Sequence, residues 1–202
     1  MVAIMERVEW DEAVLALGGT PGSAQPAERY AEPHRKYHDL THVRQVVRDA
    51  VAMTEGRDRA VVALAAWAHD VVYDGRPGED ERASAAWARA TLTAAGLAED
   101  DVARVAGLVL ATAGHTAPPG DRAAQALLDA DLAILAAPPE EYERYRQSVR
   151  AEYAHVTDDQ WRAGRAAVLR SLLAKDPLYP LARHREAAAR RNLAAELAAL
   201  EG

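Results

Sequence analysis

Hydrophobic residues recur at every third or fourth position along most of the chain, which is the spacing of a helix with one buried face. Stretches rich in glycine and proline, such as GGTPGSAQP at 18–26 and GHTAPPG at 114–120, interrupt this pattern and mark loops. Helices are therefore expected at 5–17, from an N-cap at Asp39 or Thr41 to Gly56, from Asp58 to the GRPGED loop, and at 79–95, 99–113, 121–136, 139–155, 157–174 and 181–201.

The composition favours an all-α fold. Hydrophobic residues make up 50% of the 202 positions, so the chain can bury a sizeable core. Alanine is abundant, phenylalanine is absent, and clusters of strand-favouring Val, Ile, Thr and aromatic residues are rare. The length suits one large domain better than two, so we expect a single helical domain over 1–202.

Cysteine content, charge and hydropathy exclude several kinds of site and partner. The chain has no cysteine, so a metal site would need histidine and carboxylate ligands. The formal net charge of −7 gives no electrostatic reason to expect extended nucleic acid as a partner. There is no basic leader, and no segment approaches about 18 uncharged apolar residues, so we expect a cytoplasmic protein with no membrane partner.

The segment WAHDVVYD at 67–74 places an ionisable pair, His69 and Asp70, among apolar residues. A buried carboxylate without a partner costs several kcal/mol. The Cα atoms of neighbouring residues are only about 3.8 Å apart, so one divalent cation could contact both side chains and compensate the aspartate. The alternative is a neutral histidine that hydrogen bonds to a backbone carbonyl, beside a capping or salt-bridged aspartate.

Two other segments also bring ligand-type side chains into apolar helices. His42 lies near the start of the helix predicted in YHDLTHVRQVV, and LLDADLAIL carries Asp129 and Asp131 without basic neighbours. Three predicted helices thus each contribute an imidazole or a carboxylate. This coincidence favours one shared metal site.

The order of a histidine, a His-Asp pair and a distant aspartate resembles the HD superfamily of metal-dependent phosphohydrolases. The similarity is closest to the bacterial branch described as predicted metal-dependent HD phosphohydrolases, and it covers most of the chain. The resemblance implies an HD-type helical bundle with its metal-site core at about 34–136 and C-terminal helices at about 139–201. The blocks that carry it, in order, are RKYHDLTHV, WAHDVVYD, GEDERASA, LDADLAIL and EYAHVTDDQWRAGRAAVL.

Carried over to this sequence, the resemblance implies that His42, His69, Asp70 and Asp131 bind one divalent ion, with Asp70 also taking part in catalysis. Asp131 is preferred to Asp129 because the family's last aspartate usually precedes a leucine or similar residue, here in ADLAIL. The ligand set leaves Mn, Fe, Co, Ni, Mg and Zn open.

Four further residues are candidates for the site. Glu81, in DERASA, is expected to orient a metal-bound water, or else to be a first-turn glutamate that the helix dipole favours. Arg35, His38 and His115 are expected to bind substrate phosphate oxygens. The alternatives are a surface charge for Arg35, a structural role for His38 and an exposed loop position for His115.

The expected activity is hydrolysis of a small phosphorylated substrate, such as a nucleotide, by metal-activated water. One alternative is an iron-dependent HD-type oxygenase, although such sites generally have additional histidines between the His-Asp pair and the last aspartate, where this chain has only His115. Another alternative is a non-enzymatic, metal-containing ligand-binding module. The substrate, the native metal and the formation of a homo-oligomer stay open.

Overall fold

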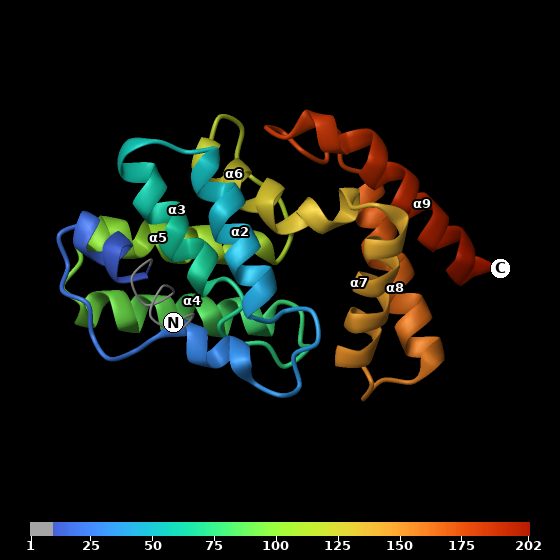
Figure 1. Cartoon of the computed structure of the whole chain (residues 1–202), viewed down its shortest axis with the longest axis horizontal. Helices are drawn as coiled ribbons and strands as arrows, with labels where there is room; N and C mark the ends of the chain where they lie inside the picture. Colours follow the sequence, from blue (N-terminus) through green and yellow to red (C-terminus); the bar gives the residue numbers. More distant parts are fainter. Residues whose placement is uncertain (1–9) are drawn as a thin grey trace. The chain divides into compact units, whose positions relative to one another are not determined.

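The computed structural model describes residues 10–202, and this part of the chain is built from helices without a β-strand (Figure 1). The all-α expectation is therefore confirmed. The chain divides into two compact units, with the boundary between Ala130 and Asp131. The expectation that the whole chain forms a single domain stays a prediction. Each unit is described separately below.

The first unit is organised around α3 (Gly56–Ala68), in which residues 61–68 are all buried. This helix packs against α2, α4 and α5, which explains why its sequence, AVVALAAWA, is apolar on every side. A short 3-10 helix, η1, also contacts α3. The other elements are η1 (Pro26–Ala31), α2 (Leu40–Ala52), α4 (Glu79–Ala94), α5 (Glu99–Thr112) and α6 (Arg122–Asp131), whose last residue lies beyond the unit boundary.

The start of α2 has a well-defined side-chain cap. The carboxylate of Asp39 accepts hydrogen bonds from the backbone N–H groups of Thr41 at 2.8 Å and His42 at 3.2 Å. These amides have no partner within the helix, so an acidic N-cap stabilises the first turn. Of the two candidates for the cap, Asp39 is confirmed, and the capped turn is the one that carries His42.

The end of α3 differs from the prediction. The helix ends at Ala68, so His69 is the C-cap and Asp70 follows in a turn, whereas the pattern predicted a helix that continued through both. Backbone carbonyls at this end bind side chains from outside the helix: the Tyr30 hydroxyl donates to the Trp67 carbonyl at 2.9 Å, and Arg35 donates to the Asp70 carbonyl at 2.8 Å. These bonds supply donors to backbone carbonyls that have no hydrogen-bond partner within the helix once it ends.

Other boundaries also differ from the periodic pattern. The helix predicted at 121–136 is α-helical only to Asp131 and continues as the 3-10 helix η2 (Leu132–Ala136). The helix predicted at 5–17 is observed over 10–16, and residues 5–9 lie outside the described range. The 3-10 helix η1 was not predicted. The helix predicted at 181–201 begins with the 3-10 turn η3 (Arg183–Arg185) and continues as α9 (Glu186–Glu201).

The second unit consists of η2, η3 and three longer helices around a buried ion pair. Arg165 donates to both carboxylate oxygens of Glu196, from Nε at 2.8 Å and from Nη2 at 3.0 Å. The Tyr142 hydroxyl donates to the same carboxylate at 2.5 Å. These contacts link the three helices, which are α7 (Pro139–Glu152), α8 (Asp158–Leu173) and α9.

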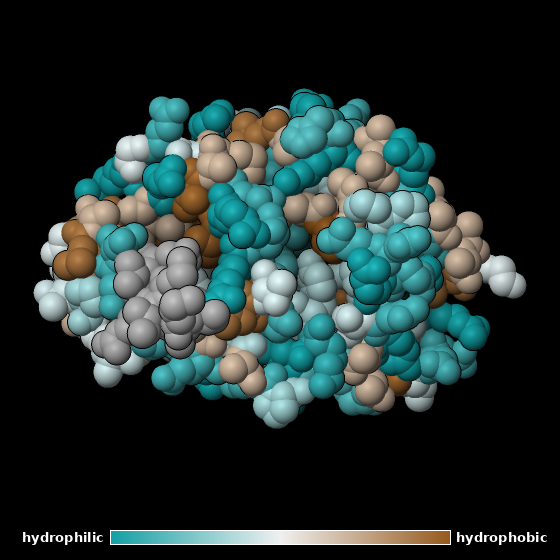
Figure 2. Space-filling view, in the orientation of Figure 1, coloured by the Kyte–Doolittle hydropathy of each residue, from teal (hydrophilic) through white to brown (hydrophobic). Residues whose placement is uncertain are grey.

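Among the described residues, none of the helices is both long enough and apolar enough to cross a bilayer. The face shown in Figure 2 is mainly hydrophilic, with hydrophobic residues scattered over it. Large hydrophobic side chains that are exposed in the described part of the chain are Leu15, Leu110 and Val168. Isolated exposed residues of this kind are ordinary on protein surfaces.

Candidate metal centre

Three ligand-type side chains converge from the ends of three helices. His42 comes from the first turn of α2, His69 from the C-cap of α3, and Asp131 from the last residue of α6. The two histidines are buried and Asp131 is half-buried, and each residue offers a ligand atom within 4.8 Å of the others. This group could hold a metal ion.

The orientation of the His69 ring follows from its hydrogen bond to the preceding helical turn. The Nδ1 atom lies 2.7 Å from the Ala66 carbonyl oxygen. A carbonyl can only accept, so Nδ1 carries the hydrogen, and Nε2 is the nitrogen whose lone pair a metal ion would use when the ring is neutral. Metal-binding histidines usually have this arrangement, in which one nitrogen is anchored and the other faces the ion.

The spacing of the facing atoms suits a shared ion. The Nε2 atoms of His42 and His69 are 3.3 Å apart. Ligand atoms about 2.1 Å from an ion lie about 3.0 Å apart when adjacent in an octahedron and about 3.4 Å apart in a tetrahedron. The 3.3 Å separation of the two nitrogens therefore lies in the range expected for two ligands of one ion.

Asp70 lies beside this group. One of its carboxylate oxygens is 3.0 Å from His69 Nε2 and 3.7 Å from His42 Nε2. Asp70 is not a member of the three-residue group, so its role as the fourth ligand stays a prediction. The group contains Asp131, the aspartate preferred from the sequence, whereas Asp129 is completely buried within α6.

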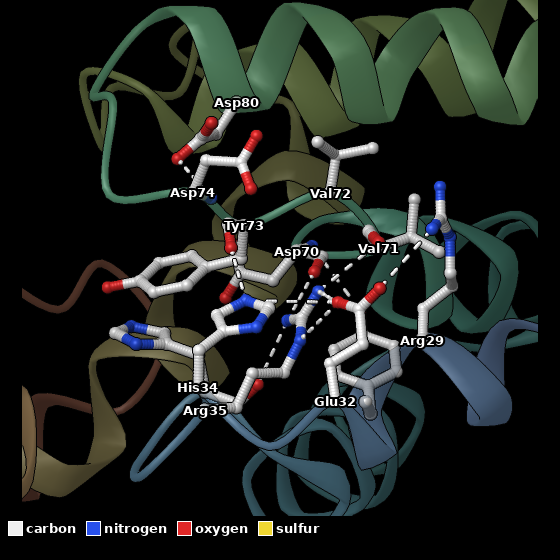
Figure 3. A network of polar contacts seen from close by, with 12 residues as sticks. Arg29, Glu32, His34, Arg35, Asp70, Val71, Val72, Tyr73, Asp74 and Asp80 are labelled. Carbon is white, nitrogen blue, oxygen red and sulfur yellow. Dashed lines mark hydrogen bonds and ion pairs between the residues drawn. The ribbon is translucent and has the colours of Figure 1, made fainter. Parts of the chain in front are cut away.

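Arg35, expected to bind substrate, is buried in the first unit. Its guanidinium donates to the carboxylate of Glu32 and to backbone carbonyls, including those of Asp70 and Val71 (Figure 3). Figure 3 shows these acceptors grouped around the guanidinium. This buried placement differs from the surface charge given as the alternative, and a contact between Arg35 and a substrate stays a prediction.

His38 and His115 occupy different surroundings. The half-buried His38 ring stacks on Tyr73 with a centroid distance of 4.2 Å, and its centroid is 5.4 Å from that of the His42 ring. His38 therefore lies next to a candidate metal ligand. His115 lies in the loop after α5 with a φ of 46°. A contact between His115 and a substrate stays a prediction.

Glu81 caps the start of α4. Its carboxylate accepts a hydrogen bond from the Gly78 backbone N–H at 2.5 Å, within the turn where Gly78 has a φ of 81°. This is the structural alternative foreseen for a first-turn glutamate, because acidic side chains stabilise the N-terminus of a helix. A role for Glu81 in orienting water stays a prediction.

Two residues of the same sequence block were missed by the sequence analysis. Asp80 is buried, and its carboxylate accepts from the backbone N–H groups of Asp74 and Arg76. The Ser84 hydroxyl accepts from the Val72 N–H and donates to the Val72 carbonyl. Both side chains hold the loop that follows the His-Asp pair. The signal for both residues is the block GEDERASA itself, which contains Asp80 and Ser84 beside Glu81.

Comparisons of the chain with protein-family models, with curated proteins and with solved structures found no match. The similarity to HD phosphohydrolases therefore rests on the sequence blocks alone.

Proposed function

We propose that the protein is an HD-type, metal-dependent hydrolase of a small phosphorylated substrate such as a nucleotide. The observation that carries this proposal is the convergence of His42, His69 and Asp131, with the His69 ring anchored so that its Nε2 lone pair faces the group. Histidine and carboxylate together are a ligand set that several divalent ions accept.

His42, His69 and Asp131 would hold the ion, with Asp70 as the fourth ligand. When bound, a divalent ion polarises a phosphoryl oxygen and lowers the pKa of a water molecule at the same site. The two carboxylates balance the charge of the ion, so an anionic substrate needs further donors. His38, next to His42, suits a contact with a non-bridging phosphate oxygen.

The test is a hydrolysis screen with protein first stripped of metal by a chelator. Each of Mn²⁺, Fe²⁺, Co²⁺, Ni²⁺, Mg²⁺ and Zn²⁺ is added separately, and phosphate release is measured for a panel of nucleotides and phosphorylated metabolites. We expect at least one ion to restore turnover of at least one phosphate ester. His184→Ala serves as a matched control, because His184 is exposed in the second unit and should leave that turnover unchanged.

The screen also distinguishes the alternatives. Iron-dependent oxygen consumption without phosphate release would replace the proposal with an oxygenase. Stoichiometric ion binding without turnover of any compound would favour a ligand-binding module. Either result contradicts the proposed hydrolase.

A further inference from the structure

The Arg35 guanidinium is completely enclosed by protein, although its neighbours in the sequence are half-exposed or exposed. The exposed fraction of its side chain is 0%. Burying a charge of this kind is costly unless opposite charge and hydrogen bonds compensate it. The hydrogen-bond acceptors and charges around the Arg35 guanidinium therefore indicate its role.

All five N–H groups of Arg35 have acceptors within the protein. Nη1 donates to the carbonyls of His38 at 3.0 Å and Asp70 at 2.8 Å. Nη2 donates to the Val71 carbonyl at 3.3 Å and to Glu32 Oε2 at 3.1 Å. Nε donates to the same Glu32 oxygen at 3.2 Å. A guanidinium has five N–H donors, so none remains for a phosphate.

The three carbonyl acceptors belong to the two segments that carry the candidate metal-binding histidines. The His38 carbonyl lies one residue before the cap of α2, which leads to His42. The Asp70 and Val71 carbonyls directly follow His69 at the end of α3. One planar side chain therefore fixes the end of α3 against the segment that leads into α2.

Electrostatics and packing favour a cation at this position. Glu32 supplies an opposite charge, and the carbonyls at the end of α3 carry the partial negative charge of a helix C-terminus. The guanidinium carbon lies 5.0 Å from the centroid of the Tyr30 ring and 5.7 Å from that of the Tyr73 ring. The Tyr30 hydroxyl also accepts from the Asp70 N–H at 3.3 Å, so the backbone of Asp70 is held on both sides.

We infer that Arg35 is a positioning residue, which sets the distance between the His42 and His69 ring nitrogens and the direction of Asp70, and that it is not a phosphate ligand. The inference rests on the proposed function, because the positions of His42, His69 and Asp70 matter for function only if these residues bind a metal ion. Partners that orient metal ligands typically change metal affinity by about 10- to 100-fold when they are removed. Lysine keeps the charge but cannot form the five-donor fork.

The experiment measures Mn²⁺ affinity by calorimetry and the unfolding temperature of the metal-free protein. Arg35→Lys should weaken Mn²⁺ binding by about tenfold or more in folded protein. Glu32→Gln, at a half-exposed side chain, should weaken it by a smaller factor and covers the case in which Arg35→Lys does not fold. Arg104→Lys is the matched control, since Arg104 forms a guanidinium fork with Asp121 in the same unit.

A purely structural role would lower the unfolding temperature and leave the Mn²⁺ affinity of the folded variants unchanged, and that result would overturn the inference. Unchanged affinity together with a raised KM for a phosphate ester would instead make Arg35 a substrate ligand. If the wild-type protein binds no ion, the proposed function fails, and the inference fails with it. These results are distinguishable because only the last one involves the wild type.

Discussion

Asp131→Asn is expected to weaken divalent-ion binding by more than about 100-fold, because loss of an outer partner alone costs about 10- to 100-fold and this change removes a ligand charge. The amide has nearly the same size as the carboxylate, so the packing of α6 is preserved. Affinity is measured by calorimetry with Mn²⁺, and the content of helix is checked by circular dichroism.

Asp129→Asn is the matched control on the same helix. Asp129 is two residues earlier and completely buried, and it is not a member of the converging group. We expect this variant, when folded, to keep the wild-type affinity for the ion. The reverse pattern, with binding lost in Asp129→Asn and kept in Asp131→Asn, would exchange the two aspartates in the ligand assignment.

Glu196→Ala is expected to lower the free energy of unfolding of the second unit by about 3–5 kcal/mol, because it leaves the buried Arg165 guanidinium without its counter-charge. The Tyr142 hydroxyl also loses its acceptor. Urea unfolding, followed by circular dichroism, measures the change. A loss below about 1 kcal/mol, the value of a surface ion pair, would contradict the buried character of this pair.

The control replaces together the three residues joined by the Glu196 hydrogen bonds; the 3.6 Å ion pair of Arg146 with Glu196 is lost in both variants and so cancels in the comparison. In the variant Tyr142→Phe, Arg165→Met, Glu196→Leu, no buried charge or hydroxyl of these three residues is left without a partner. Apolar replacement of a complete buried ion pair is often neutral or stabilising. We therefore expect this triple variant to recover most of the stability lost in Glu196→Ala.

The same cluster predicts a pH dependence. Burial by itself raises the pKa of Glu196, but the hydrogen bonds and charge of Arg165 outweigh it and hold that pKa below its usual value of 4.5. A carboxyl group with a lowered folded-state pKa contributes stability above its unfolded pKa and loses it as the pH falls through the folded one. Wild-type stability should therefore fall below about pH 4.5 more steeply than that of the triple variant.

Local chemistry at helix starts and the choice of ligands could be predicted from the sequence. Asp39 precedes a helical pattern and has the side chain of an N-cap, so α2 could be placed to within a few residues. His42, His69 and the aspartates of LLDADLAIL could be selected as candidates because ligand-type residues in apolar helices are costly unless something compensates them. The preference for Asp131 over Asp129 comes only from the resemblance to the HD superfamily. The convergence of His42, His69 and Asp131 depends on the tertiary arrangement of the three helix ends, which the helical pattern does not contain.

Hydrogen bonds from side chains to backbone carbonyls could not be predicted. Every residue has a carbonyl group, so the sequence does not show which carbonyls will accept such bonds. Arg35 reads as a surface charge until the carbonyls of His38, Asp70 and Val71 surround it. The same applies to the change from α6 to η2: the Tyr179 hydroxyl donates to the Leu132 carbonyl, 47 residues away. Such bonds depend on tertiary structure and override the helical pattern.

The most direct test of the central claim is a crystal structure of the protein with Mn²⁺, with the ion located by its anomalous scattering. We predict one peak with ring nitrogens of His42 and His69 and a carboxylate oxygen of Asp131 at about 2.0–2.3 Å. An Asp70 oxygen at the same distance would establish the fourth ligand. A saturated crystal with no peak among these three residues, or with its ion bound elsewhere, would contradict the proposed metal centre.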